Sequence, residues 1–503
     1  MIVSAGLSAL ACSSSDPVAA QPSSSPPAVV VPVADAGMDD GSADGGSVGV
    51  KAVVPPAALD GLSISTGVLS PAFSPTVLDY TISSLNSLVP IDVTMSAADG
   101  LALTINGKAA VSTAPSSLQL KPREDITLTV ASTSGESKTY TVHYVPPTLP
   151  AYTVTNSSPS LAGSELVLLT PQLGWLLIVD RTGAPLYYQA PPSSPAFVTD
   201  FRPQTFAGGL RGYSYAIQGE AIHLLDDHFR ETGKLAVLAN RDHGPLPSDI
   251  HDFLVLGAEH YLLMAYASKV LDLSAIDASW SSAAKVTSAV IQEIDHGAVT
   301  FEWDSDQEPS LFSDSVFSNA FSDAAPSDYV HANSFQIDPL DGNIIVSLRH
   351  TSSILKINRT TGATMWTLGG KSDEFGLTTE QRTAFQHHVN KQADGSLLVF
   401  DNGALAIPGD HPTRVVSYVL DESDKTVTSF NAIYTRPSAQ PDTTFMGSAF
   451  LMSADRYLIG WGGRSDTAAT WPAVSEVVGG SVVWSLTFAT PTVFSYRAHP
   501  MQN

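Results

Sequence analysis

Cysteine is nearly missing from this sequence, which has one such residue, Cys12, among 503. A single cysteine cannot form a disulfide within the chain, and zinc sites built from several cysteines are excluded as well. Basic residues are also scarce, with 25 Lys and Arg against 49 Asp and Glu, which gives a net charge of −24. So acidic a chain repels the phosphate backbone, and we therefore expect no nucleic-acid partner.

Long apolar runs are absent too, and no stretch reaches the roughly 18 residues that a transmembrane helix needs. The chain starts with MIVSAGLSALACSSSDP, a short run of small and apolar residues that ends at Cys12. This start resembles a bacterial lipoprotein signal, so we expect residues 1–12 to be a signal segment and Cys12 to be lipidated. The protein would then be exported to the outer membrane or cell surface and would touch the membrane only through its lipid anchor. An ordinary secretory signal with an incidental cysteine, which would leave the protein periplasmic or secreted, is the alternative.

Residues 13–55 consist largely of Ser, Pro, Ala, Gly and Asp. Such a segment buries too little apolar surface to offset its ordering entropy, and we expect a flexible tether. Residues 56–147 contain short segments of alternating polarity, such as LDYTISS and ITLTVASTSG, separated by Gly, Asn or Pro. This pattern predicts a small antiparallel β-sandwich. The frame LSISTGVLSPAFSPTVLDYTI, closed by TSGESKTYTVHYV, resembles the bacterial cadherin-like β-sandwich domain, which implies a spacer or adhesion module.

Residues 148–503 show little helical periodicity and contain a repeat. The unit Ser334–Gly370 divides into four short strands with turns between them, which is typical of one propeller blade. Segments like its second strand recur at Ala258, Asp394 and Ala454, several of them roughly 50 to 60 residues apart. We therefore predict an all-β protein, a six-bladed β-propeller with an N-terminal small β-sandwich domain. A two-sheet assembly of the same length is the alternative.

In three of these repeats a histidine stands at the entry to the first, innermost strand of the blade: His251, His331 and His387. The first strands of propeller blades line the central channel, so the three imidazoles should converge near the axis. The corresponding place in a later repeat, Met446–Gly447, has no histidine, so a blade does not need one there. The alternative is a chance coincidence of scattered histidines.

Three converging histidines can ligate a metal, or they can divide nucleophilic and acid/base roles. Arg349 should reach the channel from the strand beside His331. Its guanidinium would add positive charge to a metal site, whereas its planar fork matches the oxygens of a sulfate or phosphate group. Asn333, on the same strand face as His331, could add a hydrogen-bond donor. We therefore favour transfer of an oxyanion group and expect no metal.

An ordered set of motifs carries a family resemblance: HDF at His251, VHANS at Val330, SLRHTSSILKINRTTGATMWTLGG, and FQHHVN followed by LLVFDNG. Together they resemble the arylsulfotransferase family, bacterial enzymes that move a sulfuryl group between phenols without a nucleotide donor. The resemblance implies a six-bladed propeller with its site at the axis, an aryl sulfate donor and a phenolic acceptor, and no cofactor.

The resemblance also implies roles for single residues. His387 would be the nucleophile that forms a transient sulfohistidine in a ping-pong reaction. His331 would act as acid and base, and Arg349 would hold the sulfuryl oxygens. His251 matches a further active-site histidine, and Asn333 an accompanying polar residue that contacts substrate.

The residue after the nucleophilic histidine is His388, where this branch of the family usually has an acidic residue. Consecutive side chains of a strand point to opposite faces, so only one of His387 and His388 can face the axis. Gln386 favours His387, and we expect His388 to contact substrate or to face another layer.

Other polar residues carry no predicted catalytic role. We expect His350 and His411 to be solvated, Asp401 and Asn402 to make turn hydrogen bonds, and the acidic insertion near Asp304–Asp328 to be solvated. Two other functions stay open: a lipid-tethered adhesive propeller without catalysis, and a hydrolase or metalloenzyme that uses the same histidines.

Overall fold

The computed structural model describes residues 55–502 apart from 159–164, 172–173, 191–196, 206–210, 318–320, 404–410, 439 and 465–466. The predicted signal segment with Cys12, and the predicted tether through residue 54, lie outside the described residues.

The N-terminal domain is a β-sandwich of two sheets, as predicted. Its strands alternate between buried and exposed residues, and Leu128 and Val130 of one strand pack with Tyr140 and Val142 of the next. The smaller sheet contains β1 (Leu59–Ile64), β5 (Ile91–Ala97) and β8 (Pro115–Leu118). The larger contains, in order, β2 (Leu69–Ser70), β3 (Asp79–Ile82), β10 (Ser137–His143), β9 (Ile126–Ala131), β6 (Ala102–Ile105) and β7 (Lys108–Ala110).

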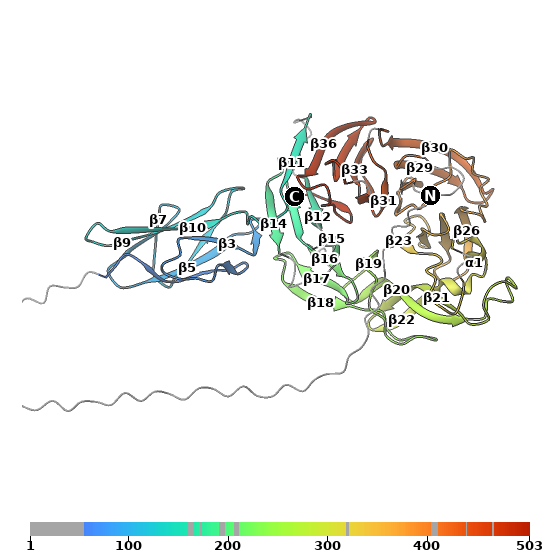
Figure 1. Ribbon diagram of the computed structural model, residues 1–503, viewed down its shortest axis with the longest axis horizontal. Coiled ribbons are helices and arrows are strands. Elements are labelled where there is room, and N and C mark those ends of the chain that lie inside the picture. The colour runs from blue at the N-terminus through green and yellow to red at the C-terminus, as the bar shows by residue number, and fades with distance from the viewer. Residues whose placement is uncertain are drawn as a thin grey trace, which may run out of the picture. The chain divides into compact units, whose positions relative to one another are not determined.

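The described residues that follow form six antiparallel sheets arranged in a ring (Figure 1), the arrangement of a β-propeller. The first three, each written from its innermost strand, are β37 (Ala498–Gln502), β12 (Glu165–Leu169), β13 (Leu176–Val179) and β14 (Pro185–Gln189); β15 (Val198–Thr205), β16 (Arg211–Ile217), β17 (Ile222–Asp226) and β18 (Glu231–Leu235); and β19 (Phe253–Val255), β20 (His260–Leu271), β21 (Ala284–Asp295) and β22 (Ala298–Asp304).

The fourth sheet is the one that the predicted repeat unit describes. The last three are β23 (Ala332–Ile337), β24 (Ile344–Leu348), β25 (Ser353–Ile357) and β26 (Thr364–Gly369); β27 (His388–Lys391), β28 (Ser396–Asp401), β29 (Arg414–Asp421) and β30 (Thr426–Thr435); and β32 (Ser448–Ser453), β33 (Arg456–Gly460), β35 (Val474–Val478), β36 (Ser481–Phe488) and β11 (Tyr152–Asn156). A short ribbon pairs β31 (Thr443–Phe445) with β34 (Gly463–Arg464).

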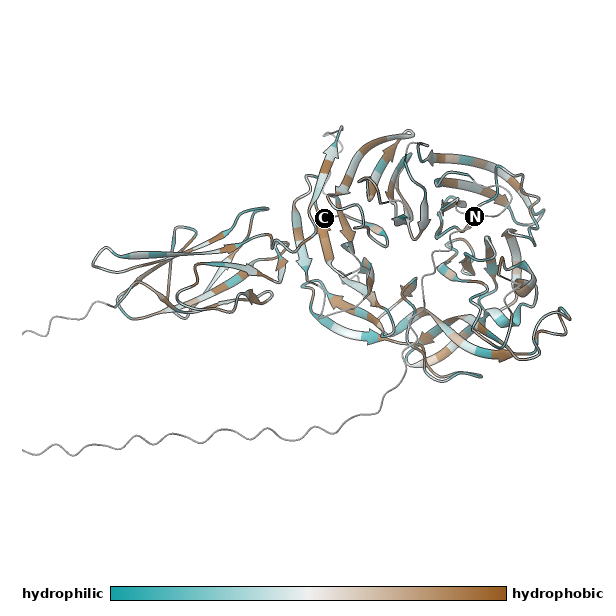
Figure 2. Cartoon of the chain, viewed as in Figure 1, coloured by the Kyte–Doolittle hydropathy of each residue, from teal (hydrophilic) through white to brown (hydrophobic). Residues whose placement is uncertain are grey.

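Hydrophobic residues run along the strands of both domains (Figure 2) and form the cores between neighbouring sheets. The innermost strands of neighbouring sheets pack together, as β23 does with β27 and β37 with β15. Residues that precede these strands therefore meet around the central channel.

Strands from both ends of the propeller complete its first and last sheets. β37 pairs with β12, with Met501 opposite Leu166 and His499 opposite Leu168. β11 pairs with β36 in the last sheet. A strand of the sandwich, β4 (Ser84–Asn86), extends the first sheet through β14. The ring is thus closed by main-chain hydrogen bonds between residues far apart in sequence.

The insertion between β22 and β23 differs from the solvated segment that the sequence predicts. It contains the short 3₁₀ helix η4 (Ser305–Gln307) and the helix α1 (Ser310–Asp314). Leu311 and Phe312 are buried, and Phe312 stacks on Tyr329 with ring centroids 4.3 Å apart. Tyr329 directly follows Asp328, so this packing fixes the backbone next to Asp328. No helix among the described residues is long and apolar enough to cross a membrane.

Candidate active site

Three predicted histidines meet at one end of the central channel. His251 and His331 stand just ahead of the innermost strands β19 and β23, and His387 directly precedes β27. The rings of His251 and His331 lie edge to face, with centroids 4.9 Å apart. His387 lies close enough to both for their charges to act on its pKa. The structure thus brings together the histidines that the repeat alignment groups.

Irregular backbone conformations orient the side chains of His331 and His387. His331 has a φ of 49° and Phe385, two residues before His387, a φ of 54°. These left-handed conformations are uncommon for residues other than glycine and cluster at functional sites. The register of β23 also shifts between Ala332 and Ser334. Such a bulge re-aims the side chain beside it, here His331, without ending the sheet.

Each of the three rings is held through its Nδ1 atom. His251 Nδ1 lies 2.6 Å from Asp249 Oδ1, and His331 Nδ1 lies 2.5 Å from Asp328 Oδ2. These carboxylates accept the Nδ1 proton, so the neutral imidazoles carry their lone pair on Nε2.

His387 is held by an amide instead of a carboxylate. Its Nδ1 lies 2.8 Å from Asn402 Oδ1. Asn402 Nδ2 donates to the carbonyl oxygens of Thr443 and Met446, each at 3.0 Å, which fixes the orientation of the amide. Oδ1 must therefore accept from His387 Nδ1, and the lone pair of His387 lies on Nε2.

The pKa values follow from these partners. Burial, reinforced by the charge of Arg349, lowers the pKa of His387 well below its usual value, so this ring is neutral at neutral pH. Burial also lowers the pKa of His331, although the charge of Asp328 opposes it. Burial alone would raise the pKa of Asp328, but His331 and His350 lower it below its usual value. Asp328 is thus ionised and stabilises the imidazolium of His331.

Arg349 follows β24 and has neutral partners. Its Nη1 donates to His350 Nε2 at 2.8 Å, and its Nη2 donates to the carbonyl oxygen of Thr444 at 3.2 Å. The guanidinium lies over the ring of Phe385, 4.6 Å from the centroid. Burial lowers the pKa of Arg349 to about 10, so it stays charged at neutral pH. Within the described part of the chain it forms no ion pair with a carboxylate, although the charge of Asp328 acts on it, and its donors are available to an anion.

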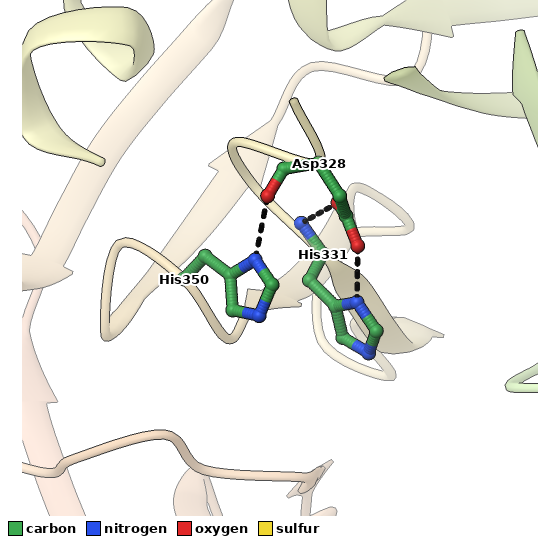
Figure 3. Close-up of side chains that lie close together, drawn as sticks. All are labelled: Asp328, His331 and His350. Carbon is green, nitrogen blue, oxygen red and sulfur yellow. Dashed lines mark hydrogen bonds and ion pairs between the residues drawn. The ribbon is translucent and has the colours of Figure 1, made fainter. Parts of the chain in front are cut away.

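His350 is a site residue, and the expectation that it is solvated is wrong. Its side chain is buried, and its Nδ1 donates to the backbone oxygen of Asp328 at 2.6 Å (Figure 3). Its ring lies 4.6 Å from that of His331. Asp328 was missed as well. A signal for the carboxylates was present, because Asp249 and Asp328 each precede a clustered histidine by two or three residues.

The expectations for Asn402 and His411 need correction, whereas Asp401 makes the expected turn hydrogen bond, with the N–H of Gly403. Asn402 is fully buried and orients His387, which is more than a turn hydrogen bond. Asp401 accepts from Arg414 Nε at 2.9 Å as well as from nearby backbone N–H groups. His411 Nε2 lies 3.1 Å from Asp401, so this histidine is not free in solvent. These residues brace the turn that carries Asn402.

His388 faces a cavity that the three histidines do not line, and Asn333 contacts the backbone ahead of His387. His388 accepts a 3.4 Å hydrogen bond from the backbone N–H of Ala449 and lies against Phe450, in a separate cavity of about 300 Å³. Asn333 is buried, and its Nδ2 donates to the backbone oxygen of Gln386 at 2.8 Å. Asn333 therefore braces the backbone ahead of His387. That either residue contacts substrate stays a prediction.

A metal could find three ligand atoms in Asp328, His331 and His350, which lie within 4.8 Å of one another. However, both Nδ1 atoms are engaged by Asp328, and Arg349 donates to His350 Nε2. A cation bound there would therefore be repelled by the nearby positive charge of the Arg349 guanidinium. The arrangement fits an anionic ligand better than a metal.

Comparisons with known families match both domains. A family described as Arylsulfotransferase (ASST) matches residues 215–470, and one described as Cadherin-like beta sandwich domain matches residues 59–145. No match to a curated protein was found.

Solved structures resemble the chain at low sequence identity. A protein of unknown function from Bacteroides caccae is 12% identical, with 67% of this chain and 99% of that chain covered and a TM-score of 0.40. A quinonprotein alcohol dehydrogenase-like protein from Bacteroides thetaiotaomicron is 11% identical, with 84% and 96% covered and a TM-score of 0.35. A virginiamycin B lyase from Staphylococcus aureus is 11% identical, with 72% and 88% covered and a TM-score of 0.31.

Proposed function

The chain belongs to the arylsulfotransferase family, and from this premise we propose that it moves a sulfuryl group from a phenolic sulfate ester to a phenol through a sulfohistidine at His387. The family supports a transferase in general, with an aryl sulfate donor and a phenol acceptor. The ping-pong route and the residue roles below are our proposal.

One observation carries this proposal: a neutral histidine lies beside an arginine that forms no ion pair with a carboxylate among the described residues. His387 keeps its proton on Nδ1 through Asn402, so its Nε2 lone pair is free to attack. Arg349 supplies a positive charge and planar donors for the oxygens of a sulfuryl group. Charge that develops in the transition state is then stabilised by a preformed site.

In the first half-reaction, His387 Nε2 attacks sulfur, an N–S bond forms and the S–O bond to the aryl group breaks. The leaving phenolate takes a proton from the protonated fraction of His331, which the charge of Asp328 stabilises against the lowering of the His331 pKa by burial. His387 then carries the sulfuryl group on Nε2, its Nδ1 proton still held by Asn402. His331 is left neutral, ready to accept a proton.

In the second half-reaction, an acceptor phenol gives its proton to His331 and attacks the sulfur. The N–S bond breaks, a new aryl sulfate leaves, and His387 returns to its neutral form. His251, paired with Asp249 and packed against His331, adds a second imidazole beside the acid/base histidine.

Intact-protein mass spectrometry after mixing with 4-nitrophenyl sulfate tests the proposal. We expect one added sulfuryl group on the wild type and none on His387→Ala. His388→Ala is the matched control, because His388 is adjacent in sequence but faces the separate cavity, and it should form the adduct. An adduct that persists in His387→Ala, or no adduct and no phenol release across a panel of aryl sulfates, would reject the sulfohistidine and favour a binding propeller.

We also propose that the protein is exported and anchored through a lipid on Cys12, which the lipoprotein-like start of the sequence supports. Detergent-phase partitioning of the wild type and of Cys12→Ser tests this. Partitioning of the wild type into the aqueous phase would count against the anchor.

A further inference from the structure

His350 occupies the position between Arg349 and the backbone of Asp328. Its Nδ1 donates to the Asp328 carbonyl oxygen at 2.6 Å, so its Nε2 carries the lone pair that accepts from Arg349 Nη1 at 2.8 Å. Figure 3 shows that the same aspartate uses its carboxylate for His331 and its backbone for His350. The two histidines therefore differ in the charge of their partner.

A carboxylate is the usual partner of a buried arginine, because the pair neutralises two charges that are costly to bury. Here the acceptors of Arg349 are an imidazole nitrogen and a carbonyl oxygen, and the third contact is the ring of Phe385. These partners hold the guanidinium in place and leave its net charge intact.

We propose that His350 is a positioning residue, whose neutral imidazole holds Arg349 toward the sulfuryl group without neutralising it. This inference rests on the proposed function of the same site. Two features of its surroundings keep the His350 imidazole neutral. Burial, with the charge of His331, lowers its pKa to about 4, and its Nδ1 partner is a carbonyl rather than a carboxylate. The His350 ring also packs against Phe317 in a T-shaped contact, with centroids 4.7 Å apart, which helps to fix the ring.

The pair His350→Gln and His350→Glu tests the proposal, because the two side chains have the same shape and reach. Gln offers a neutral oxygen to Arg349, and Glu offers a charged one. We expect kcat/KM of the first half-reaction to stay within about fivefold of the wild type in His350→Gln and to fall by about 100-fold in His350→Glu, the scale of losing one charge-stabilising group.

Binding of inorganic sulfate, measured by calorimetry, is the readout that does not depend on catalysis. We expect sulfate to bind the wild type and His350→Gln alike and His350→Glu much more weakly. Equal affinity and equal rates in the two variants would mean that His350 acts only through packing, and would overturn the inference. Absence of sulfuryl transfer in the wild type would instead reject the proposed function, while the sulfate series would still decide the role of His350.

Circular dichroism establishes whether each variant folds. If His350→Glu does not fold, His350→Leu takes its place, because it removes the acceptor of Arg349 without adding charge. Weaker sulfate binding in His350→Leu than in His350→Gln supports the proposal, and unchanged binding overturns it.

Discussion

The central channel contains two groups of charged residues built from the same residue types. At one end, the histidine cluster comprises His251, His331, His350 and His387 together with Arg349. Farther along the innermost strands lies an ion-paired layer, made of the residues Arg202, Asp252, Arg497, His388 and His499. In this layer Arg202 lies 2.7 Å and Arg497 3.3 Å from the carboxylate of Asp252. In the cluster, the carboxylates face histidines and the arginine faces neutral groups.

This difference in pairing separates the candidate site from the ion-paired layer. Carboxylates beside arginines cancel charge and fix the strands, and Arg202 and Arg497 hold the pKa of Asp252 well below its usual value despite its burial. Carboxylates beside histidines leave a proton that can be exchanged, and an arginine beside an imidazole keeps its charge for a ligand. His499 of the layer also pairs with a carboxylate, that of Asp200 at 2.8 Å, so it is the pairing of the arginines that distinguishes the candidate site from the layer.

Removing the arginine of each group should give opposite phenotypes, and this is the largest effect we expect. Arg349→Met should lower kcat/KM for 4-nitrophenyl sulfate by about 1,000-fold, because the transferring charge loses its main partner. Arg497→Met should instead lower the free energy of unfolding by about 3 kcal/mol, because it breaks a buried ion pair. Steady-state kinetics and urea unfolding of both variants distinguish the two roles. A large loss of stability in Arg349→Met without a kinetic defect would erase the distinction.

Changing the partner of His387 from an amide to a carboxylate should sharpen the comparison further. In Asn402→Asp the new charge raises the pKa of His387, so more of the ring is protonated as the pH falls and its lone pair is lost. We expect kcat/KM to fall by about tenfold near pH 6 and to recover at alkaline pH, since one pKa unit corresponds to a factor of ten. In the wild type, whose His387 pKa is lowered, the acid limb should lie well below pH 6.5. The pH profiles of the two proteins measure the shift, and superimposable profiles would contradict it.

Changing the partner of His331 from a carboxylate to an amide should have the smallest effect, and the size of that effect should depend on the substrate. Asp328→Asn still accepts from His331 Nδ1 but no longer stabilises the imidazolium, so proton donation weakens. We expect roughly a tenfold loss with phenyl sulfate, whose leaving group needs the proton, and almost none with 4-nitrophenyl sulfate. A comparison of kcat/KM for the two substrates checks this. Equal losses would indicate a defect in geometry instead of proton transfer.

Much of this architecture could be predicted from the sequence, because strand periodicity and repetition are local properties. The alternation of side chains at the start of β27 predicts that His387, just ahead of the strand, and His388, its first residue, face different ways, and the repeat places three histidines ahead of innermost strands. The roles of His350 and Asn402 could not be predicted, because they depend on contacts across the channel. His350 uses the backbone of Asp328 at the end of an insertion, and Asn402 reaches His387 only because two carbonyl groups from another segment orient its amide.

The closure of the ring by β37 has a consequence for when the candidate site is complete. Tyr496, just ahead of this strand, donates from its hydroxyl to the backbone oxygen of His251 at 2.9 Å, and Arg497 donates to that of Asn333 at 3.0 Å. Until the residues around β37 dock, β12 presents an open edge and these braces of the channel are missing. The candidate site of a growing chain is therefore incomplete until β37 pairs with β12, even though all of its histidines are already present.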